Sequence, residues 1–252
     1  MCILNVLNNI YYFGDKYGIY AMSERQYGSI SFFSVYFHTS PLLVFSLSFY
    51  SYKYINNKNY INLFYYVITF LSLIVSGTRN NLFSAFLISI VSYLLFSQNS
   101  KNRLILFILI TLLVFLFIPN MIDIIQGNPT SDKTKLNFVK DYFNQMKDFK
   151  TILFGQGLGS SFYTCERGFV SLTELTYLEI FRRFGFIIGS LQIFLMIYPF
   201  LYWRALPIYK KWIIISYAFY LIMVFFNPFY FSSNGIILLS FVLLSKYNFQ
   251  KQ

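Results

Sequence analysis

Residues 60–96 read YINLFYYVITFLSLIV (60–75), then SGTRNN (76–81), then LFSAFLISIVSYLLF (82–96). At about 1.5 Å per residue, one helix over this stretch would be far longer than the roughly 30 Å hydrocarbon core of a bilayer. The polar break between the two apolar runs therefore predicts a tight turn that joins two membrane spans, at about 60–77 and 80–97. Further apolar runs recur along the chain, so we expect a polytopic membrane protein.

The composition excludes an ordinary soluble globular protein. Of the 252 residues, 57% are hydrophobic and only 12% are charged, and the mean hydropathy is +0.55. A soluble domain carries about 25% charged residues, so this chain has too little polar surface to cover a water-soluble globule. The net charge of +11 would indicate nucleic-acid binding in a soluble protein, but lysine- and arginine-rich cytoplasmic loops explain it in a membrane protein. Two cysteines are too few for a disulfide framework or a zinc cluster.

The whole chain is predicted to be an all-α bundle of about seven transmembrane helices with one large external loop. The expected spans are 30–50, 60–77, 80–97, 104–118, 172–200, 212–226 and 229–245. The resulting divisions are an external N-terminal segment (1–29), spans one to four (30–119), a large periplasmic or extracellular loop (120–172), spans five to seven (173–245) and a cytoplasmic tail (246–252). Helical spacing of apolar residues within 133–150 predicts a short amphipathic helix in the loop.

The distribution of charge supports this arrangement and sets its orientation. If the N-terminus is external, the loops 51–60, 98–103 and 201–211 and the tail are cytoplasmic. These segments contain no Asp or Glu, and their basic residues are Lys53, Lys58, Lys101, Arg103, Arg204, Lys210, Lys211, Lys246 and Lys251. Because Lys and Arg concentrate in short cytoplasmic loops, we expect a cytoplasmic C-terminus and an external segment 120–172, which in a bacterium means periplasmic or extracellular. An external N-terminus without a signal sequence indicates the C-terminal part of a longer protein.

Arg79 lies at the outer turn between two of the expected spans. An arginine at the membrane edge either extends its charged head to the lipid headgroups or binds an anion. The second span would begin at about Asn80, and the free N–H groups and dipole at its start would also favour an anion. Both interpretations stay open from the sequence alone.

A second group of charges lies near the start of the helix expected at 172–200. Glu179 precedes Arg182 and Arg183 by three and four residues, which allows an ion pair on one helix face. Such a pair would leave one arginine uncompensated, and guanidinium groups bind diphosphate oxygens bidentately. Glu174, near the membrane boundary, is either a partly desolvated general base or a carboxylate stabilised by a helix N-terminus.

Two further features are interpreted as structural. Residues 155–159 (GQGLG) lack the βαβ context and the Lys-Ser/Thr pair of a nucleotide-binding loop, so their glycines predict a tight backbone turn. His38 is the only histidine, so it has no second histidine with which to share a metal and is expected to form a hydrogen bond inside the bundle. No metal or other cofactor is expected.

Three stretches form a pattern when they are taken in order. They are LIVSGTR (73–79), LFGQGLG (153–159) and TELTYLE (173–179), the last followed by Gly185 and Gly189. They resemble the Ser-Gly-Ser/Thr-Arg hairpin, the Phe-Gly-x-Gly loop element and the following helix of the O-antigen polymerase and ligase superfamily. Glu174 stands where the ligases usually have histidine, and the ending at 227–235 (NPFYFSSNG) is similar to Wzy-type polymerases. The resemblance covers residues 60–245.

The resemblance implies inverting, metal-independent glycosyl transfer at the outer face of the inner membrane. A glycan on undecaprenyl diphosphate would be transferred to the non-reducing end of a new lipid-linked repeat unit, to build O-antigen, capsule or exopolysaccharide. The implied partners are undecaprenyl-diphosphate-linked oligosaccharides and membrane lipid, with a chain-length regulator protein as a further candidate and without nucleic acid. The implied site residues are catalytic Glu174 and Glu179, diphosphate-binding Arg79, Arg182 and Arg183, and glycan-binding Arg167 and Tyr177.

Three alternatives to a polymerase are considered. A ligase of the same superfamily would place finished glycan on another carrier. A transporter or flippase of lipid-linked glycan is less consistent with a large external loop, with charges confined to the outer ends of spans, and with the absence of an internal sequence repeat. An inactive fragment would follow if missing spans supplied part of the site.

Overall fold

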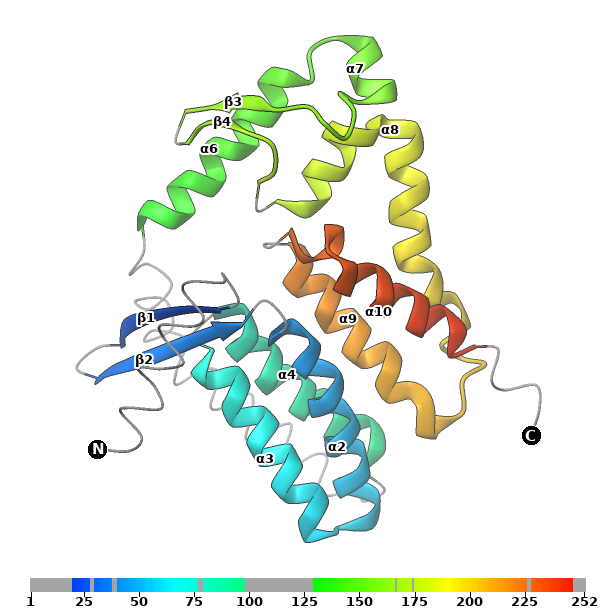
Figure 1. Ribbon diagram of the computed structural model, residues 1–252. Helices are drawn as coiled ribbons and strands as arrows, with labels where there is room; N and C mark the ends of the chain where they lie inside the picture. Colours follow the sequence, from blue (N-terminus) through cyan, green and yellow to red (C-terminus); the bar gives the residue numbers. More distant parts are fainter. Residues whose placement is uncertain are drawn as a thin grey trace. The chain divides into compact units, whose positions relative to one another are not determined.

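The computed structural model describes residues 20–27, 30–37, 40–76, 79–97, 129–165, 167–173, 175–225 and 228–246 (Figure 1). The described chain is mostly helical, as expected. It divides into two compact units, each of which is described by itself. The first comprises Met1–Pro119 with Ile215–Tyr220, and the second comprises Asn120–Ile214 with Leu221–Gln252.

The first unit is built on three consecutive packed helices, α2 (Leu43–Asn57), α3 (Tyr60–Val75) and α4 (Arg79–Phe96). Lys58 adopts the left-handed conformation (φ 45°) after α2, and the Asn59 side chain accepts a hydrogen bond from the Ile61 N–H at the start of α3. These two residues let the chain reverse within a very short connection. Because α2 continues to Asn57, the loop expected at 51–60 is largely helical.

The turn predicted between the expected spans 60–77 and 80–97 is confirmed. α3 ends at Val75 and α4 begins at Arg79. The buried Asn81 side-chain amide donates to the Ser76 hydroxyl at 2.7 Å, and this hydroxyl donates to Leu73 O at 2.6 Å. The buried polar side chains of Ser76 and Asn81 are thus hydrogen-bonded at the ends of the two apolar helices.

The helix expected over 30–50 is wrong in its first part. Strand β1 (Tyr20–Tyr27) pairs antiparallel with β2 (Ile30–Phe37), and a 3₁₀ turn (Ser40–Leu42) precedes α2. Residues 30–37 (ISFFSVYF) are rich in β-branched and aromatic side chains, which favour a strand, and Pro41 disfavours helix immediately before it. His38 and the span expected at 104–118 lie outside the described residues.

The second unit contains most of the predicted external loop and the C-terminal helices (Figure 1). Its helices form close to the positions expected from the sequence, but the loop also contains a short β-hairpin, which the all-α prediction did not include. The elements are α6 (Pro129–Gln145), α7 (Phe149–Phe154), β3 (Phe162–Thr164), β4 (Gly168–Val170), α8 (Thr176–Ile197), η2 (Tyr198–Tyr202), η3 (Ile208–Lys210), α9 (Lys211–Phe225, shared with the first unit), η4 (Pro228–Phe231) and α10 (Ser233–Leu244).

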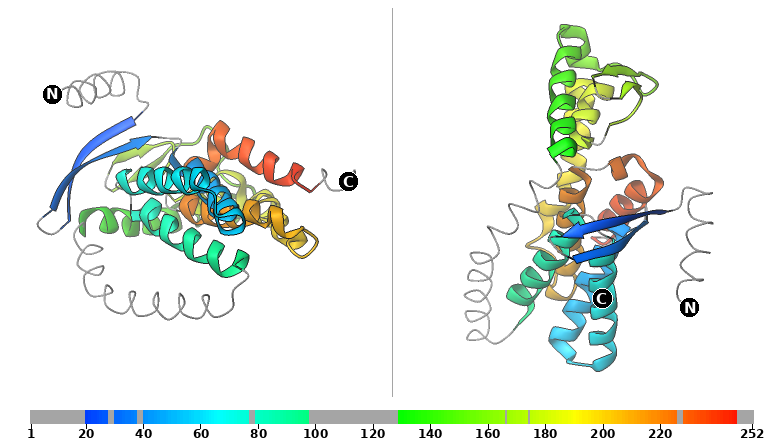
Figure 2. Two further views of the ribbon diagram at one scale, coloured as in Figure 1. Left: turned by 90° about the horizontal axis from the view of Figure 1, so that it is seen from below. Right: turned by 90° about the vertical axis from the view of Figure 1, so that its left-hand side faces the viewer.

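Residues 129–173 share a small hydrophobic core with the start of α8. α6 lies beside the β3–β4 hairpin, which Figure 2 shows from the side. The core consists of Phe138, Tyr142, Phe162 and Leu175, packed against Val139, Met146, Val170 and Leu178. The predicted amphipathic helix is thus present as α6, although Leu136 and Phe143, also part of the predicted apolar pattern, are exposed.

Helix α8 is kinked at Gly185, which has φ 69° and ψ −178° (Figure 1). We call the part of α8 before the kink its outer arm and the part after the kink its inner arm. The outer arm contains no strongly exposed large apolar side chain. The inner arm and η2 expose Phe186, Ile187, Ile188, Leu191, Phe194, Leu195, Ile197 and Leu201. The kink therefore separates an arm packed against protein from an arm that presents an apolar surface.

Two helical stretches among the described residues are long and apolar enough to cross a membrane, Thr176–Tyr202 and Ile208–Phe225. Three shorter helices are also apolar, at Tyr60–Val75, Phe83–Phe96 and Ser233–Leu244. The count of seven spans stays a prediction.

Candidate functional site

The segment that follows α7 meets α8 by direct backbone contact between two glycines, Gly155 and Gly185. A Cβ added to Gly155 would lie 2.4 Å from Arg183 O, and one added to Gly185 would lie 2.3 Å from Leu153 O. Gly155 and Gly185 also have positive φ, at 75° and 69°. Only glycine combines this backbone conformation with this approach. The interpretation of the GQGLG stretch as a tight turn is confirmed, and its contact with the kink of α8 is an additional finding.

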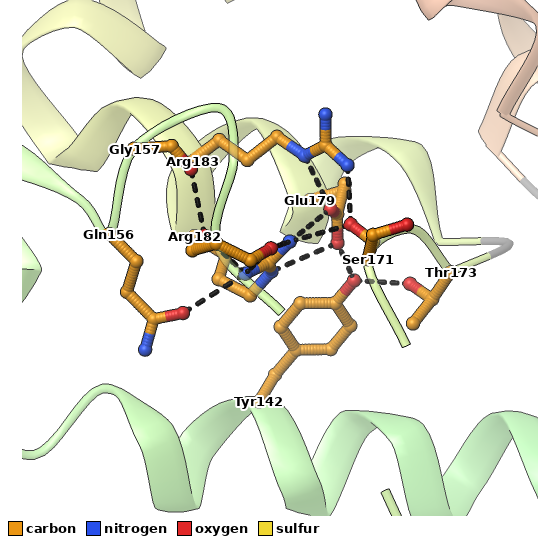
Figure 3. A network of polar contacts seen from close by, with 9 residues as sticks. Tyr142, Gln156, Gly157, Ser171, Thr173, Glu179, Arg182 and Arg183 are labelled. Atoms are coloured by element: carbon orange, nitrogen blue, oxygen red, sulfur yellow. Dashed lines mark hydrogen bonds and ion pairs between the residues drawn. The ribbon is translucent and has the colours of Figure 1, made fainter. Parts of the chain in front are cut away.

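The same contact orders the backbone on both sides. Gln156 N donates to Arg182 O at 2.7 Å, and Gly157 N donates to Arg183 O at 3.0 Å (Figure 3). These carbonyls lie just before the kink, where Gly185 departs from helical geometry. The turn at residues 155–159 is thus hydrogen-bonded to α8 at Arg182 and Arg183, the two arginines predicted as site residues.

Glu179 lies at the centre of a buried polar network (Figure 3). Its side chain has no exposed surface, and its Oε1 lies 2.5 Å from Arg182 Nη2 and 2.6 Å from Arg183 Nε. Oε2 accepts from Arg182 Nε at 3.2 Å and from the Tyr142 hydroxyl. The predicted pair between Glu179 and an arginine is confirmed, but the carboxylate contacts both arginines rather than one.

Arg182 is fully buried and all three of its guanidinium nitrogens donate to protein acceptors. Nη1 donates to Gln156 Oε1 at 3.0 Å and to Ser160 Oγ at 2.8 Å, and Nη2 donates to Ser171 O at 3.0 Å. The guanidinium carbon also lies 4.7 Å from the centre of the Phe162 ring. This side chain therefore ties α8 to three positions within residues 156–171. A contact between Arg182 and diphosphate stays a prediction.

Arg183 lies at the edge of the network, with its side chain 12% exposed. Nε donates to Glu179, Nη2 donates to Ser171 O, and the guanidinium carbon lies 5.3 Å from the centre of the Phe231 ring. Nη1 forms no hydrogen bond within the part of the chain that the structure describes. Since one glutamate faces two arginines, the network keeps a net positive charge, and Arg183 is the member that presents it to solvent.

Tyr142 connects α6 to the network. Its hydroxyl is hydrogen-bonded to Glu179 Oε2 and to the Thr173 hydroxyl, and its ring packs against Phe162 with centroids 5.1 Å apart. Burial raises the pKa of the Tyr142 phenol above its usual range, and the negative charge of Glu179 acts in the same direction. Tyr142 is thus a neutral hydrogen-bond donor that connects α6 to Glu179.

The two predicted glycan-binding residues lie in different surroundings. The Tyr177 hydroxyl donates to Leu221 O at 3.0 Å, and its ring lines a shallow apolar hollow of about 340 Å³ with Leu221, Ile222 and Phe225. The exposed Arg167 lies in the β3–β4 turn with its guanidinium carbon 5.4 Å from the centre of the Phe138 ring. Neither side chain belongs to the Glu179 network, and glycan binding by either stays a prediction.

Two predicted residues are not placed by this geometry. Glu174, the first candidate base, lies outside the described residues. Arg79 is the first residue of α4, in the first unit, and its side chain lies outside the described part. Its meeting with Arg182 and Arg183 stays a prediction. Within the described chain, no group of three or more His, Cys, Asp and Glu side chains is arranged to hold a metal ion.

Sequence reasoning missed several members of the network, namely Tyr142, Gln156, Ser160, Ser171 and Thr173. Helical spacing placed Tyr142 on the inner face of α6, but no local signal linked it to Glu179, 37 positions away. The glycines at 155 and 185 were the available signal, because glycine is the residue used where another backbone approaches closely.

Two of the three stretches that carry the resemblance meet at this network, namely 153–159 and 173–179 with Gly185. No protein-family model, curated protein or solved structure matches the chain. The functional proposal therefore depends on the residues and geometry of this chain and on the resemblance of its short motifs.

Proposed function

We propose that the chain is a multi-pass inner-membrane polymerase that joins undecaprenyl-diphosphate-linked oligosaccharide repeat units outside the cytoplasm. The observation that carries the proposal is the buried Glu179 network, in which one glutamate faces two arginines and the partly exposed Arg183 lies at the edge. The network therefore keeps a net positive charge. An anionic leaving group requires such a cation, and guanidinium suits diphosphate.

The apolar surfaces of the helices support insertion into a membrane. A soluble protein rarely exposes contiguous apolar patches of this kind. Besides the inner arm of α8, α3 exposes Tyr60, Ile61, Phe64, Tyr65, Val67, Ile68, Leu71 and Val75, and α10 exposes Ile236, Ile237, Phe241 and Leu244. Seven spans with the large loop outside remain the arrangement that fits the distribution of charge.

The network sits at the outer end of a membrane-spanning helix in this proposal. From the kink at Gly185 to Tyr202, the inner arm and η2 would span roughly 25 Å at about 1.5 Å per residue, which is close to the thickness of a hydrocarbon core. Arg183, two residues before the kink, would then lie at the level of the lipid headgroups. A diphosphate attached to a membrane lipid lies at the same level.

The residues have distinct roles in the proposed reaction. Glu174 removes the proton from the acceptor hydroxyl, the hydroxyl oxygen forms the new glycosidic bond at the anomeric carbon of the donor, and the bond from that carbon to the diphosphate oxygen breaks. Arg183 stabilises the charge that collects on the departing undecaprenyl diphosphate. Glu179 and Arg182 are positioning residues, because their polar atoms are already bonded within the protein.

Deletion of the gene from its native bacterium, followed by electrophoresis of the surface glycan, tests this proposal. We expect the ladder of long glycans to disappear while a single repeat unit remains, and the wild-type gene to restore the ladder. Accumulation of long lipid-linked polymer would indicate a ligase instead. Lipid-linked single units with no surface glycan would indicate a transporter.

A further inference from the structure

A set of exposed apolar side chains lies on the external segment beside the kink of α8. In and just after α7, Ile152 is 41% exposed, Phe154 is 65% exposed and Leu158 is 63% exposed. Two lysines near the start of α7, Lys147 and Lys150, are also exposed. Aromatic and aliphatic side chains next to lysines are typical of a segment that rests in the membrane interface.

The position of this segment along α8 is fixed by the backbone contact of the two glycines. Leu153, Gly155 and Gly185 approach so closely that no Cβ fits between them. Phe154, the residue between Leu153 and Gly155, therefore lies close to the kink. The exposed apolar surface of the inner arm begins at the next residue after the kink, Phe186, which is 59% exposed.

We propose that residues 149–158 form an anchor that inserts its apolar side chains into the outer leaflet of the membrane. This interfacial anchor, comprising α7 and the start of the glycine turn, continues the lipid-facing surface of the inner arm of α8. Lipid is the occupant that fits, because the neighbouring surface of α8 is itself the proposed lipid-facing surface and the exposed Lys147 and Lys150 at the start of the segment complement phosphate headgroups. The anchor keeps the Glu179 network at headgroup level, where a lipid-linked diphosphate is found.

The β3–β4 hairpin provides a contrast within the same external segment. Tyr163 and Phe169 form a cross-strand aromatic pair with ring centroids 5.6 Å apart, and they are 56% and 77% exposed. Among the described residues, Tyr163 and Phe169 have no backbone contact like that of Gly155 with Gly185 to hold them beside the kink. We therefore expect them to face water, which makes Phe169 a matched control for Phe154.

Site-directed spin labelling tests the anchor in vesicles of phosphatidylethanolamine and phosphatidylglycerol. In a background with Cys2→Ser and Cys165→Ser, single cysteines are placed by Phe154→Cys, Leu158→Cys, Phe169→Cys and Phe194→Cys. Collision of each label with oxygen, which partitions into lipid, is compared with collision with a water-soluble nickel chelate. The side chains replaced at the four label positions are all exposed, so these substitutions leave the core intact.

We expect the oxygen-to-nickel ratio at Phe154 and Leu158 to be several-fold higher than at Phe169 and lower than at Phe194, in the inner arm of α8. A ratio at Phe154 and Leu158 equal to that at Phe169 would overturn the anchor. Low collision with both reagents would show that protein covers the site, which also overturns it. The inference depends on the proposed membrane insertion of α8 but not on glycan transfer, since a water-exposed label at Phe194 would refute insertion itself.

Discussion

Replacement of Glu179 by Gln tests whether the buried network holds the external segment on α8. The substitution keeps the size of the side chain but removes its negative charge, and it places an amide donor where Tyr142, Arg182 or Arg183 now donates. Arg183 can turn toward solvent, but Arg182 is fully buried and would remain as an uncompensated cation. Breaking a buried ion pair from one side costs about 3–5 kcal/mol.

Hydrogen exchange of backbone amides measures the loss of stability in the elements that contact the network. A loss of 3–5 kcal/mol corresponds to roughly two to three and a half powers of ten in the opening equilibrium. We expect amides in 138–146 of α6 and in 162–170 of the β3–β4 hairpin to exchange faster by about this factor, because these elements contact α8 through the network. Amides in α3 should keep their wild-type rates.

Two further variants identify the cause. Asp148→Asn removes an exposed carboxylate from the same segment while keeping a side chain that caps α7, so exchange should not change. The double variant Glu179→Gln with Arg182→Met removes the orphaned cation and should recover part of the protection. Unchanged exchange in Glu179→Gln alone would refute the conclusion that the ion network holds the segment in place.

Three other changes probe the same site. Gly155→Ala should destabilise the segment by more than 1 kcal/mol and remove long glycan, because its Cβ would lie 2.4 Å from Arg183 O, whereas Gly159→Ala has open space and should behave as wild type in thermal melting and on the glycan gel. Tyr142→Phe should lower the free energy of unfolding by about 1.5–3 kcal/mol. Because the pKa of Tyr142 is raised by folding, this difference is fully present below about pH 10 and should shrink as the pH rises further, which melting curves of the two proteins would detect. Arg183→Lys should abolish the glycan ladder while the protein accumulates normally. The control Arg204→Gln, at an exposed arginine, should leave the ladder unchanged. An unchanged ladder in Arg183→Lys would contradict the proposed contact between Arg183 and diphosphate.

The sequence was most informative where length and polarity alone decide the structure. The apolar runs on either side of residues 76–81 are too long for one crossing, and the polar break has side chains that satisfy the turn, so α3 and α4 form where expected. Spacing of three and four residues likewise predicted that Glu179 reaches its arginines. Both inferences depend on contacts within a few residues along the chain.

Contacts between distant residues were not predictable in this way. The strand over 30–37 differs from the expected helix because apolar content by itself does not distinguish a short strand from the start of a span. The kink at Gly185 was not foreseen either, since an isolated glycine is tolerated in many helices. Only the partner loop, 30 positions away, reveals why Gly185 has to lack a side chain.

The side chains of the Glu179 network are better suited to orienting Arg183 than to stabilising the fold. A buried glutamate with two arginines is often no more stabilising than apolar residues of similar volume, because the ions lose their hydration. It does, however, fix direction: Nε and Nη2 of Arg183 are bonded to Glu179 and Ser171, while Phe231 lies close to the guanidinium carbon. The remaining nitrogen, Nη1, is thereby held in one orientation. An anion-binding group at the membrane surface gains from such preorganisation, since the ligand does not have to order a flexible side chain when it binds.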